Sequence, residues 1–392
     1  MKQKIKEYVQ TKLPGIIELR RALHKIPETG FNEVKTSSFI ARTLEQAGFE
    51  VTTGIAKTGV TALLKGNGPG KTLLLRSDID GLPIAEETGL PFASTHPGFM
   101  HACGHDGHIA ILLGTALILK ELKNQFSGQI KFVFQPAEEG PGGAKLMIEE
   151  GVLDNPKVDY ALGLHLWASI PENKIALKAG PLMAAMDRFD LDIIGKGGHG
   201  AMPHLCKDPV DAAAQVINTL QRVVSRQMNP LSPTVVTIGT IQGGTAFNII
   251  PDKVHLSGTT RTLDKEVWKG WESRLEPMIN GVCTAAGVKY KLDYQPGYPP
   301  LINDSAVTEI ARQAAAETVG SENVIEAEAT MGGEDMAFYL EQVPGCYAFI
   351  GIGTPGCAPH HNSHFAFNEE VLGTGVKYLC NLVMEISNAR NC

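Results

Sequence analysis

Three histidines, a cysteine and an aspartate fall within residues 101–108, which read HACGHDGH. Thiolate, imidazole and carboxylate groups bind divalent transition metals, and the two glycines leave room for several ligands around one ion. A structural zinc finger would need a second pair of Cys or His ligands at a fixed spacing downstream, and none follows. Cys103 and His105 could therefore each give one ligand to an open, catalytic site. The alternative is a glycine-rich turn that caps a helix, with histidines that are merely polar.

Charged side chains follow three segments that the sequence predicts to be buried strands. These segments are apolar without alternation and span residues 72–77, 129–134 and 160–164. The charged residues that follow them are Asp78 and Asp80, Glu138 and Glu139, and His165. Open α/β sheets bind ligands at the carboxyl ends of their strands, and adjacent carboxylates are costly there unless a positive group lies beside them. Together with the Cys103/His105 turn, these positions predict a metal site at one sheet edge.

A second histidine cluster, APHHNSH, stands far along the chain at residues 358–364. A histidine-rich loop is more often surface than ligand. Two metals with catalytic openings, however, need roughly five protein ligands. Because Cys103, His105, Glu139 and His165 leave one ligand missing, the second cluster becomes a candidate source.

Four turn-like or glycine-rich stretches offer candidates for substrate contact. His199 lies in GKGGHG, Asn248 in TAFNIIP, Arg261 in GTTRT and Gly332 in MGGED. Arginine is well shaped to bind a carboxylate through two parallel hydrogen bonds. The MGGED stretch is predicted to open a helix, whose free N–H groups favour an anion or a polar substrate group. Each candidate has a plain alternative: a solvated histidine, an asparagine that caps a turn, an exposed cation, and an acidic first helical turn.

Residues 195–200 also match the G-x-G-x-x-G pattern of dinucleotide-binding proteins, which makes an NAD-dependent enzyme a remote alternative. Three features argue against this interpretation. The preceding strand alternates instead of being apolar throughout, Pro203 follows where a helix should open, and no acidic residue lies about 20 positions on.

The remaining pattern predicts helices and strands in two groups. In the first group, helices are predicted at residues 5–24 (interrupted at Pro14-Gly15), 37–48, 109–122 and 144–150, with further short strands at 50–55 and 60–65. In the second group, an alternating strand at 187–194 precedes a helix at 209–226, strands at 234–241 and 254–260, a helix at 265–286 and a strand near Tyr290. A buried strand at 347–351 belongs to a last segment that most simply rejoins the first group.

These groups predict an α/β fold with an inserted domain. Composition changes near Gly180-Pro181, and Tyr298-Pro299-Pro300 provides a second hinge. We expect a catalytic domain of residues 1–181 and 296–392, with a mixed, largely parallel sheet flanked by helices. Residues 182–295 are expected to form a smaller α+β lid or dimerisation domain with an open-faced sheet.

Bulk properties narrow the class of protein. The chain has 392 residues, 43% hydrophobic and 20% charged, and its net charge of -7 gives no basic field for nucleic acid. Its longest apolar run, residues 109–119, falls short of the ~20 residues that span a bilayer. The N-terminus is too polar for a signal peptide. Seven scattered cysteines suit reduced thiols, so we expect a cytoplasmic protein with neither nucleic-acid nor membrane partners.

Taken together, the motifs resemble a known family across nearly the whole chain. They are RSDIDGLPIAEETG, MHACGHDGH, FQPAEEG, GLHLW, GKGGHGAMPH, NIIPDKV with GTTRT, and HHNSHFAFNE, in the family's order. The sequence is similar to the two-metal amidohydrolases and peptidases that include aminoacylases, hippurate hydrolases and plant auxin-conjugate hydrolases. Its cysteine-bearing MHACGHDGH resembles the hippurate and auxin-conjugate branch, where cysteine replaces the bridging aspartate of other branches.

The resemblance implies specific roles for the metal ligands. Cys103 would bridge two metals, and His105, Glu139, His165 and one histidine of the last cluster would complete the shell. In the family that histidine stands four residues before an aromatic residue, which selects His361 by counting back from Phe365, with Ser363 at the usual proline position. His360 and His364 are the nearby competitors.

The resemblance also implies roles for the remaining candidates and an activity. Glu138 would be the catalytic glutamate, while His199, Asn248 and Arg261 would contact the substrate, often across a dimer interface. The implied reaction is hydrolysis of the amide bond of small N-acyl amino acids by two divalent ions, which could be Zn, Mn, Co or Ni. The implied assembly is a homodimer through the smaller domain, or a tetramer. A dipeptidase or metallo-carboxypeptidase of the same family is the main alternative.

Overall fold

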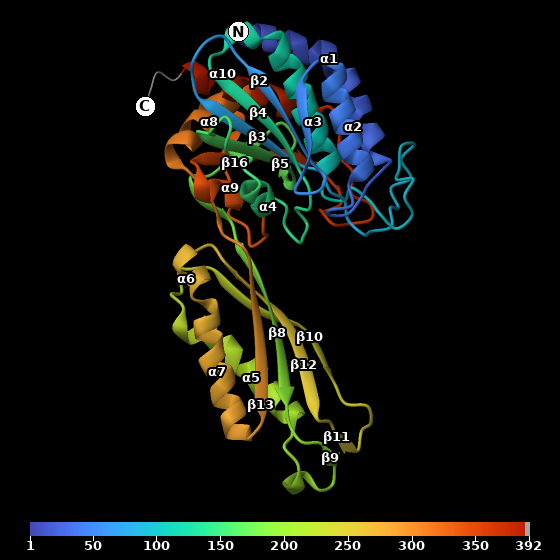
Figure 1. Ribbon diagram of the computed structural model, residues 1–392, viewed down its shortest axis with the longest axis vertical. Helices are drawn as coiled ribbons and strands as arrows, with labels where there is room; N and C mark the ends of the chain where they lie inside the picture. Colours follow the sequence, from blue (N-terminus) through green and yellow to red (C-terminus); the bar gives the residue numbers. More distant parts are fainter. Residues whose placement is uncertain (389–392) are drawn as a thin grey trace. The chain divides into compact units, whose positions relative to one another are not determined.

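The computed structural model describes residues 1–388 (Figure 1). Contacts between its residues divide the chain into two compact units. The larger unit holds residues 1–180 and 302–328 and the chain from Asp335 onward, and the smaller unit holds residues 181–301 and 329–334. The smaller unit thus takes in Pro181 and residues 296–301 and 329–334, which were predicted to lie in the catalytic domain.

An eight-stranded mixed sheet forms the centre of the larger unit (Figure 1). In spatial order its strands are β1 (Glu50–Ile55), β2 (Gly59–Lys65), β4 (Gln129–Gln135), β3 (Thr72–Asp78), β5 (Tyr160–Pro171), β16 (Gly345–Gly353), β6 (Ile175–Leu177) and β15 (Val324–Glu326). The central strands β4, β3, β5 and β16 run parallel, as do β6 and β15. The prediction of an α/β fold with a mixed, largely parallel sheet is confirmed.

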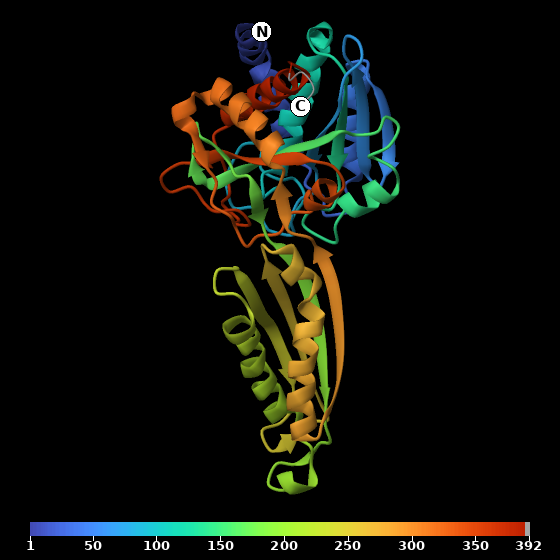
Figure 2. The same cartoon turned by 90° about the vertical axis from the view of Figure 1, so that its left-hand side faces the viewer.

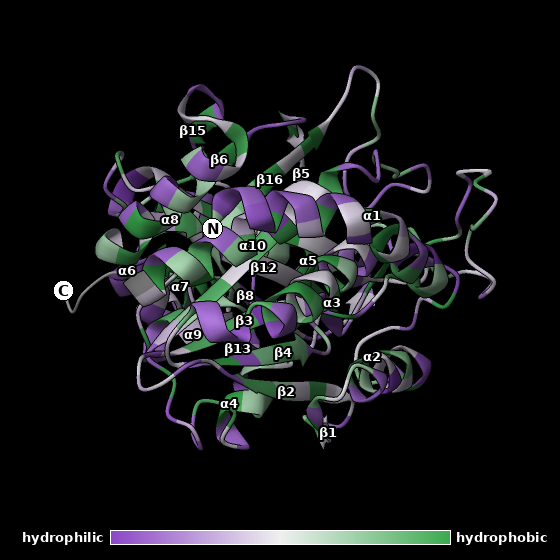
Figure 3. Cartoon of the chain, turned by 90° about the horizontal axis from the view of Figure 1, so that it is seen from above, coloured by the Kyte–Doolittle hydropathy of each residue, from purple (hydrophilic) through white to green (hydrophobic). Residues whose placement is uncertain are grey.

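Helices cover this sheet because their apolar faces need burial. Those of the larger unit are α1 (Lys2–His24), α2 (Val34–Gln46), α3 (His105–Glu121), α4 (Ala144–Glu149), α8 (Ser305–Val319), α9 (Ala337–Gln342) and α10 (Val371–Asn388). Helices α1, α3, α8 and α10 pack together, and α4 packs with α9. Helix α3 is apolar nearly all round, as the hydropathy colours in Figure 3 show, and is buried over most of its length. A buried α3 is what fixes the turn before it.

The smaller unit is a four-stranded antiparallel sheet with two long helices on one face (Figure 2). Its strands, in spatial order, are β10 (Thr234–Gly243), β12 (Lys253–Thr262), β8 (Ala185–Ile194) and β13 (Lys289–Tyr298), and its helices are α5 (Pro209–Arg222) and α7 (Trp271–Ala286). Phe189, Leu191 and Ile193 of β8 join Trp271 in the core. The opposite face is polar, since Arg188 of β8 pairs with Asp190 there.

Shorter elements complete the described chain. They are β7 (Gly180–Met183), β9 (Gly198–His199), β11 (Ile249–Ile250), β14 (Leu301–Asn303), α6 (Lys265–Lys269), the 3₁₀ turns Lys123–Gln125, Pro203–Leu205 and Ser321–Asn323, and the π-helical turn Val223–Gln227. Among the described residues, no helix combines the length and apolar character needed to cross a membrane. The six described cysteines are free thiols, and Cys392 lies outside the described residues.

Three predicted helices differ from the observed ones. Helix α1 continues through Pro14, because Ile5, Val9, Ile16 and Leu23 are buried along it and outweigh the proline's cost of roughly 3 kcal/mol. The predicted helix 265–286 is broken at Gly270 into α6 and α7. The predicted helix 209–226 is α-helical only to residue 222, where the π-helical turn follows.

Candidate metal centre

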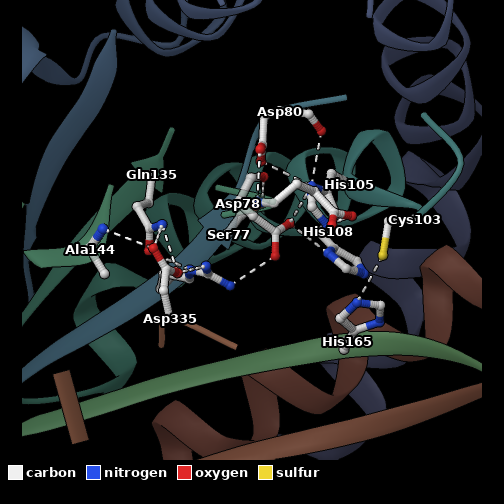
Figure 4. Close-up of polar contacts among 12 residues, drawn as sticks. Ser77, Asp78, Asp80, Cys103, His105, His108, Gln135, Ala144, His165 and Asp335 are labelled. Carbon is white, nitrogen blue, oxygen red and sulfur yellow. Dashed lines mark hydrogen bonds and ion pairs between the residues drawn. The ribbon is translucent and has the colours of Figure 1, made fainter. Parts of the chain in front are cut away.

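The carboxyl ends of β3, β4 and β5 meet at one edge of the large sheet, because the three strands are parallel neighbours. Their register pairs Asp78 with Gln135 and Arg76 with Gly163, so His165 stands level with Asp78. Helix α3 begins beside them at His105, after Gly104 adopts a left-handed φ of 86°. The polar side chains around this edge point toward one another (Figure 4).

All five ligand candidates of the sequence analysis come together there. Their ligand atoms form two groups, Cys103–His105–His165 and Cys103–Glu139–His361, and within each group these atoms lie within 4.8 Å of one another. The Cys103 Sγ is 3.5 Å from His165 Nε2, and His361 Nε2 is 3.0 Å from Glu139 Oε1. Because Cys103 belongs to both groups, the geometry suits one thiolate shared by two ions.

His105 shows which of its nitrogens is available to an ion. Its Nδ1 lies 2.9 Å from the Asp80 carbonyl oxygen and 3.2 Å from Asp80 Oδ1. Its Nε2 is buried and has no hydrogen-bond partner within the described part of the chain. A buried, unpaired ring nitrogen beside a thiol and a carboxylate fits a borderline-soft divalent metal.

The carboxylates around the site favour positive charge on their neighbours, which raises the pKa of nearby groups. Burial, followed by the charges of Glu139 and Glu138, raises the pKa of the Cys103 thiol well above its ordinary value. Burial alone would lower the pKa of His105, but the carboxylates of Asp78, Asp80 and Glu139 outweigh it and raise this pKa to about 10. The side chains by themselves therefore hold protons at Cys103 and His105. A divalent cation at the site would replace both protons.

The three histidines of the second cluster occupy different environments. His361 adopts a left-handed φ of 61°, and its N–H donates to the Ala102 carbonyl, which brings its ring to Glu139. His360 directs its Nε2 to the Leu166 carbonyl oxygen at 2.8 Å. His364 is exposed and lies beside Ser363. This arrangement favours His361 over its two competitors.

Glu138 is buried and clusters with His105 and Glu139. The turn that carries it is held by Glu33, the residue directly before α2. Glu33 Oε1 accepts a hydrogen bond from the Ala137 N–H at 2.9 Å, while Ala137 itself has a left-handed φ of 57°. Glu33 Oε2 accepts a second hydrogen bond from Thr58 at 2.6 Å. This strained backbone sets the direction of Glu138.

The smaller unit separates the remaining candidates. His199 and Asn248 are both exposed at the β9–β11 tip, where the Gly200 N–H donates to the Asn248 carbonyl oxygen. Arg261 lies at the opposite end of β12, eight residues beyond Lys253, or about 26 Å along the strand. Its guanidinium is half-buried and makes no hydrogen bond or ion pair with another described residue, while burial lowers its pKa against the opposing charge of Asp187.

Comparisons with known proteins then identify the family. The model of peptidase family M20/M25/M40 matches residues 74–385. The chain belongs to this family. A solved structure of Bacillus subtilis YXEP, described as a dinuclear metal binding peptidase from the M20 family, has a TM-score of 0.85 and 36% identity, covering 97% of this chain and 100% of that one.

Similar curated proteins are named as a deacetylase, an amidohydrolase and a carboxypeptidase. The N-acetyl-L-cysteine deacetylase of Bacillus subtilis (strain 168) is 43% identical over 91% of this chain and 84% of its own length. The N-acyl-L-amino acid amidohydrolase of Geobacillus stearothermophilus is 45% identical, with coverages of 77% and 81%. Thermostable carboxypeptidase 1 of Saccharolobus solfataricus is 38% identical, with coverages of 98% and 99%. The protein is thus a metal-dependent amidohydrolase, and a two-ion site agrees with its ligand groups.

One sequence interpretation needs correction in this M20/M25/M40 protein, and the remote dinucleotide-binding alternative, against which the sequence already argued, gains no support. The MGGED stretch does not open a helix, since α9 begins only at Ala337, and the N–H of Gly332 donates to the Thr330 hydroxyl instead. The helix-terminus argument for Gly332 is therefore lost. The GKGGHG stretch runs into β9 and a three-residue 3₁₀ turn at Pro203–Leu205, so the helix that dinucleotide binding requires is missing there.

A buried polar network beneath the site was not predicted from the sequence. Arg76 donates to Asp78 and to Asp335, both at 2.8 Å, and Asp335 also accepts the N–H groups of Gly143 and Ala144 (Figure 4). The network ties the chain after residue 335 to the end of β3 and the start of α4. A charged arginine directly after the apolar run TLLL, inside a predicted buried strand, was the available signal.

Proposed function

We propose that this protein hydrolyses the amide bond of N-acyl amino acids, releasing a carboxylic acid and a free amino acid. The observation that carries the proposal is the pair of ligand groups sharing Cys103, with Glu138 buried beside them. An open two-metal site with one further carboxylate is the arrangement that metal-assisted hydrolysis requires. The names of the deacetylase and amidohydrolase relatives support the same chemistry.

Cys103, His105 and His165 would hold one ion, and Cys103, Glu139 and His361 the other. When bound, such ions polarise a carbonyl group and lower the pKa of water. Their identity stays open among zinc, manganese, cobalt and nickel, because thiolate, imidazole and carboxylate together suit all four.

The six described free thiols support the reducing, cytoplasmic environment expected from the sequence.

Glu138 would carry the proton during the reaction. Its carboxylate would take a proton from the attacking water and return it to the nitrogen of the leaving amine, acting first as base and then as acid. Glu139 is less suited to this role. Its Oε1 already lies beside His361, and the interactions with His361 and His105 outweigh burial to lower the pKa of its carboxyl group.

The smaller unit would recognise the substrate. Arg261, half-buried and without a protein partner in the described chain, would bind the carboxylate of the amino-acid product. Asn248 would assist, and His199 would stabilise the developing oxyanion. Gly332 stays a candidate contact through its backbone, although not as part of a helix. Among the described residues Arg261 is the strongest candidate, because its charge is partly desolvated and unpaired.

The distances within the smaller unit lead us to propose a dimer. An N-acyl amino acid is about two residues long, or roughly 7 Å, whereas Arg261 lies about 26 Å along β12 from Lys253, the strand end that follows the β9–β11 tip with His199. One chain cannot place both on one substrate. The His199 of one chain would therefore serve the ions of its partner.

The dimer would form through the edge of the smaller sheet. Strand β10 is an edge strand, and exposed apolar side chains gather on it and at the tip: Ile241, Phe247 and Ile249. Unpaired edge backbone and exposed apolar groups both favour association. The open face of the sheet, by contrast, carries ion pairs such as Arg188–Asp190, so it is not the apolar surface expected for an interface.

A substrate panel tests the proposed reaction. Metal-free protein is loaded separately with zinc, manganese, cobalt or nickel and given hippurate, N-acetylmethionine, N-acetyldiaminopimelate, indoleacetylalanine and the dipeptide alanylalanine. We expect at least one N-acyl amino acid to be hydrolysed and the free-amine dipeptide to react more slowly. A preference for the dipeptide under every metal contradicts the proposal and favours the dipeptidase alternative.

The carboxypeptidase alternative has one specific observation in its favour, the similarity to thermostable carboxypeptidase 1. Both activities cleave an amide bond next to a free carboxylate and differ only in the acyl group. Adding benzyloxycarbonyl-blocked dipeptides to the same panel separates them. Faster cleavage of the blocked peptides than of every simple N-acyl amino acid would assign a carboxypeptidase.

A further inference from the structure

His108 is a buried histidine, one turn after His105 on α3, to which the proposed reaction gives no role. Its Nδ1 lies 2.6 Å from Asp78 Oδ1 (Figure 4), and its Nε2 lies 3.0 Å from the Leu166 backbone nitrogen. A backbone N–H can only donate, so His108 Nε2 must accept and His108 Nδ1 must carry the proton that Asp78 receives. Both ring nitrogens are therefore committed, and neither is available to an ion.

The Leu166 backbone connects His108 to the ligand candidates. The Leu166 carbonyl oxygen accepts from His165 Nδ1 at 2.7 Å and from His360 Nε2 at 2.8 Å. With its Nδ1 occupied, His165 presents only Nε2 to the site, 3.5 Å from Cys103 Sγ. The same carbonyl occupies His360 Nε2. The position of one backbone segment thus selects the ring nitrogen that His165 presents to the site.

The far end of this chain of contacts is anchored in the core. Asp78 accepts from Arg76 Nη1 at 2.8 Å, and Arg76 Nη2 donates to Asp335 at 2.8 Å. All of these side chains are buried. An anchored carboxylate fixes the tautomer of a histidine, and that histidine can then orient what it contacts.

We propose that His108 is a positioning residue, which holds the Leu166 backbone so that His165 turns its Nε2, and not its Nδ1, toward the ions. The inference rests on the proposed two-ion site and concerns only the ion bound by Cys103, His105 and His165. Loss of His108 should weaken the binding of that ion and leave the binding of the ion held by Glu139 and His361 unchanged.

Four variants distinguish the effect of the His108 hydrogen bonds from the effect of its packing in the core. His108→Leu removes both hydrogen bonds. His108→Gln places a side-chain oxygen near the former Nε2 and can still accept from Leu166, while His108→Asn places an amide near the former Nδ1 and serves only Asp78. His101→Leu is the matched control, because His101 is equally buried, lies in the same segment, and has neither ring nitrogen paired within the described residues.

Cobalt binding is the measurement, because it does not depend on turnover. Metal-free proteins are titrated with cobalt against a competing chelator, and the visible and thiolate-to-cobalt absorption bands are recorded. We expect His108→Leu to bind one of two ions 10- to 100-fold more weakly, with altered bands. His108→Gln should retain more affinity than His108→Asn, and His101→Leu should match the wild type.

Two results overturn the inference. Either His108→Leu binds both ions like the wild type, or all four variants lose affinity equally, which would assign the effect to packing. A wild type that binds cobalt without any thiolate band contradicts the proposed two-ion site itself, and the inference falls with it. An unchanged His108→Leu variant beside a two-cobalt wild type contradicts the inference alone.

Discussion

At the scale of single residues, the site combines groups that the protein alone would keep protonated. Burial and two carboxylates hold the proton on Cys103, and His105 has a pKa of about 10. An ion must displace both protons to reach the sulfur and the nitrogen. The affinity for metal is therefore coupled to pH through Cys103 and His105.

Proton release on metal binding follows from this coupling. Because the metal-free pKa of His105 is about 10 and that of Cys103 is raised above its ordinary value, both groups hold protons at pH 7, and metal affinity should increase as pH rises toward 10. Calorimetric titration in buffers of different ionisation enthalpy should show about two protons released per protein from Cys103 and His105, with a further contribution from His361, whose pKa is raised by its hydrogen bond to Glu139. Cys103→Ala should release one fewer, and an unchanged release would remove Cys103 from the ligand set.

Arg261 should contribute to substrate binding more than to the chemical step. A charge-assisted bond contributes about 1.5–3 kcal/mol, so Arg261→Gln should raise KM by about 10- to 100-fold with a smaller change in kcat. The control is a substrate whose carboxylate is replaced by a carboxamide. The variant and the wild type should cleave that substrate at similar rates. If the variant falls as far below the wild type on the carboxamide as on the carboxylate, Arg261 does not bind the carboxylate.

At the scale of elements, apolar runs predicted the central strands and their polar ends. The run before Asp78 and the run before His165 form β3 and β5, and their parallel pairing brings these residues to one edge. Local sequence could not show which distant side chains meet there. Glu33 reaches Ala137 across about a hundred residues of chain, and Arg76 reaches Asp335 across more than two hundred. Such contacts depend on tertiary packing, which local patterns do not encode.

The limits of local rules are also visible in the helices. Pro14 predicted a break in α1. The helix continues through it because side chains on both sides of Pro14 are buried. The acidic MGGED stretch was expected to begin a helix, yet Asp335 accepts hydrogen bonds from Arg76 and from the N–H groups of Gly143 and Ala144 at the start of α4. In both cases long-range burial outweighed local preference.

The turn that carries Glu138 should be sensitive to volume behind it. A Cβ on Gly30 would lie 2.8 Å from Ala137 Cβ and 2.9 Å from the Gly140 oxygen, both too close. Gly30→Ala should cost about 1–3 kcal/mol of unfolding free energy and reduce turnover by displacing Glu138. Thermal unfolding and steady-state rates measure the two effects.

Gly15→Ala provides the matched control for that substitution. Gly15 lies within α1, and a Cβ there meets nothing within 4 Å. Removing a helical glycine should stabilise the protein by up to about 1 kcal/mol without changing turnover. Equal behaviour of Gly30→Ala and Gly15→Ala would mean that the turn tolerates the added volume.

At the scale of the whole molecule, the proposed dimer predicts complementation between inactive chains. A Glu138→Gln chain and a His199→Ala chain are mixed and allowed to exchange subunits. Random pairing makes about half of the dimers mixed, and each mixed dimer has one site with both defects and one with neither. About a quarter of wild-type activity should return.

A second mixture controls for exchange. Glu138→Gln and Glu139→Gln both alter the candidate metal centre of the larger unit. Every site in their mixed dimers therefore carries one of the two defects, and no activity should return. Native mass spectrometry verifies that subunits exchange in both mixtures. Without recovery in the first mixture, despite verified exchange, His199 serves its own chain or has no catalytic role.

The central claim is that two ions share Cys103 and that Glu138, not Glu139, carries the proton. The most direct test measures metal content and turnover in Glu138→Gln and Glu139→Gln. Glu138→Gln should keep two ions per chain while turnover falls about 10²-fold or more, because it loses a base and no ligand. Glu139→Gln should lose an ion. If Glu138→Gln loses metal while Glu139→Gln keeps both ions, the two roles are reversed and the account is contradicted.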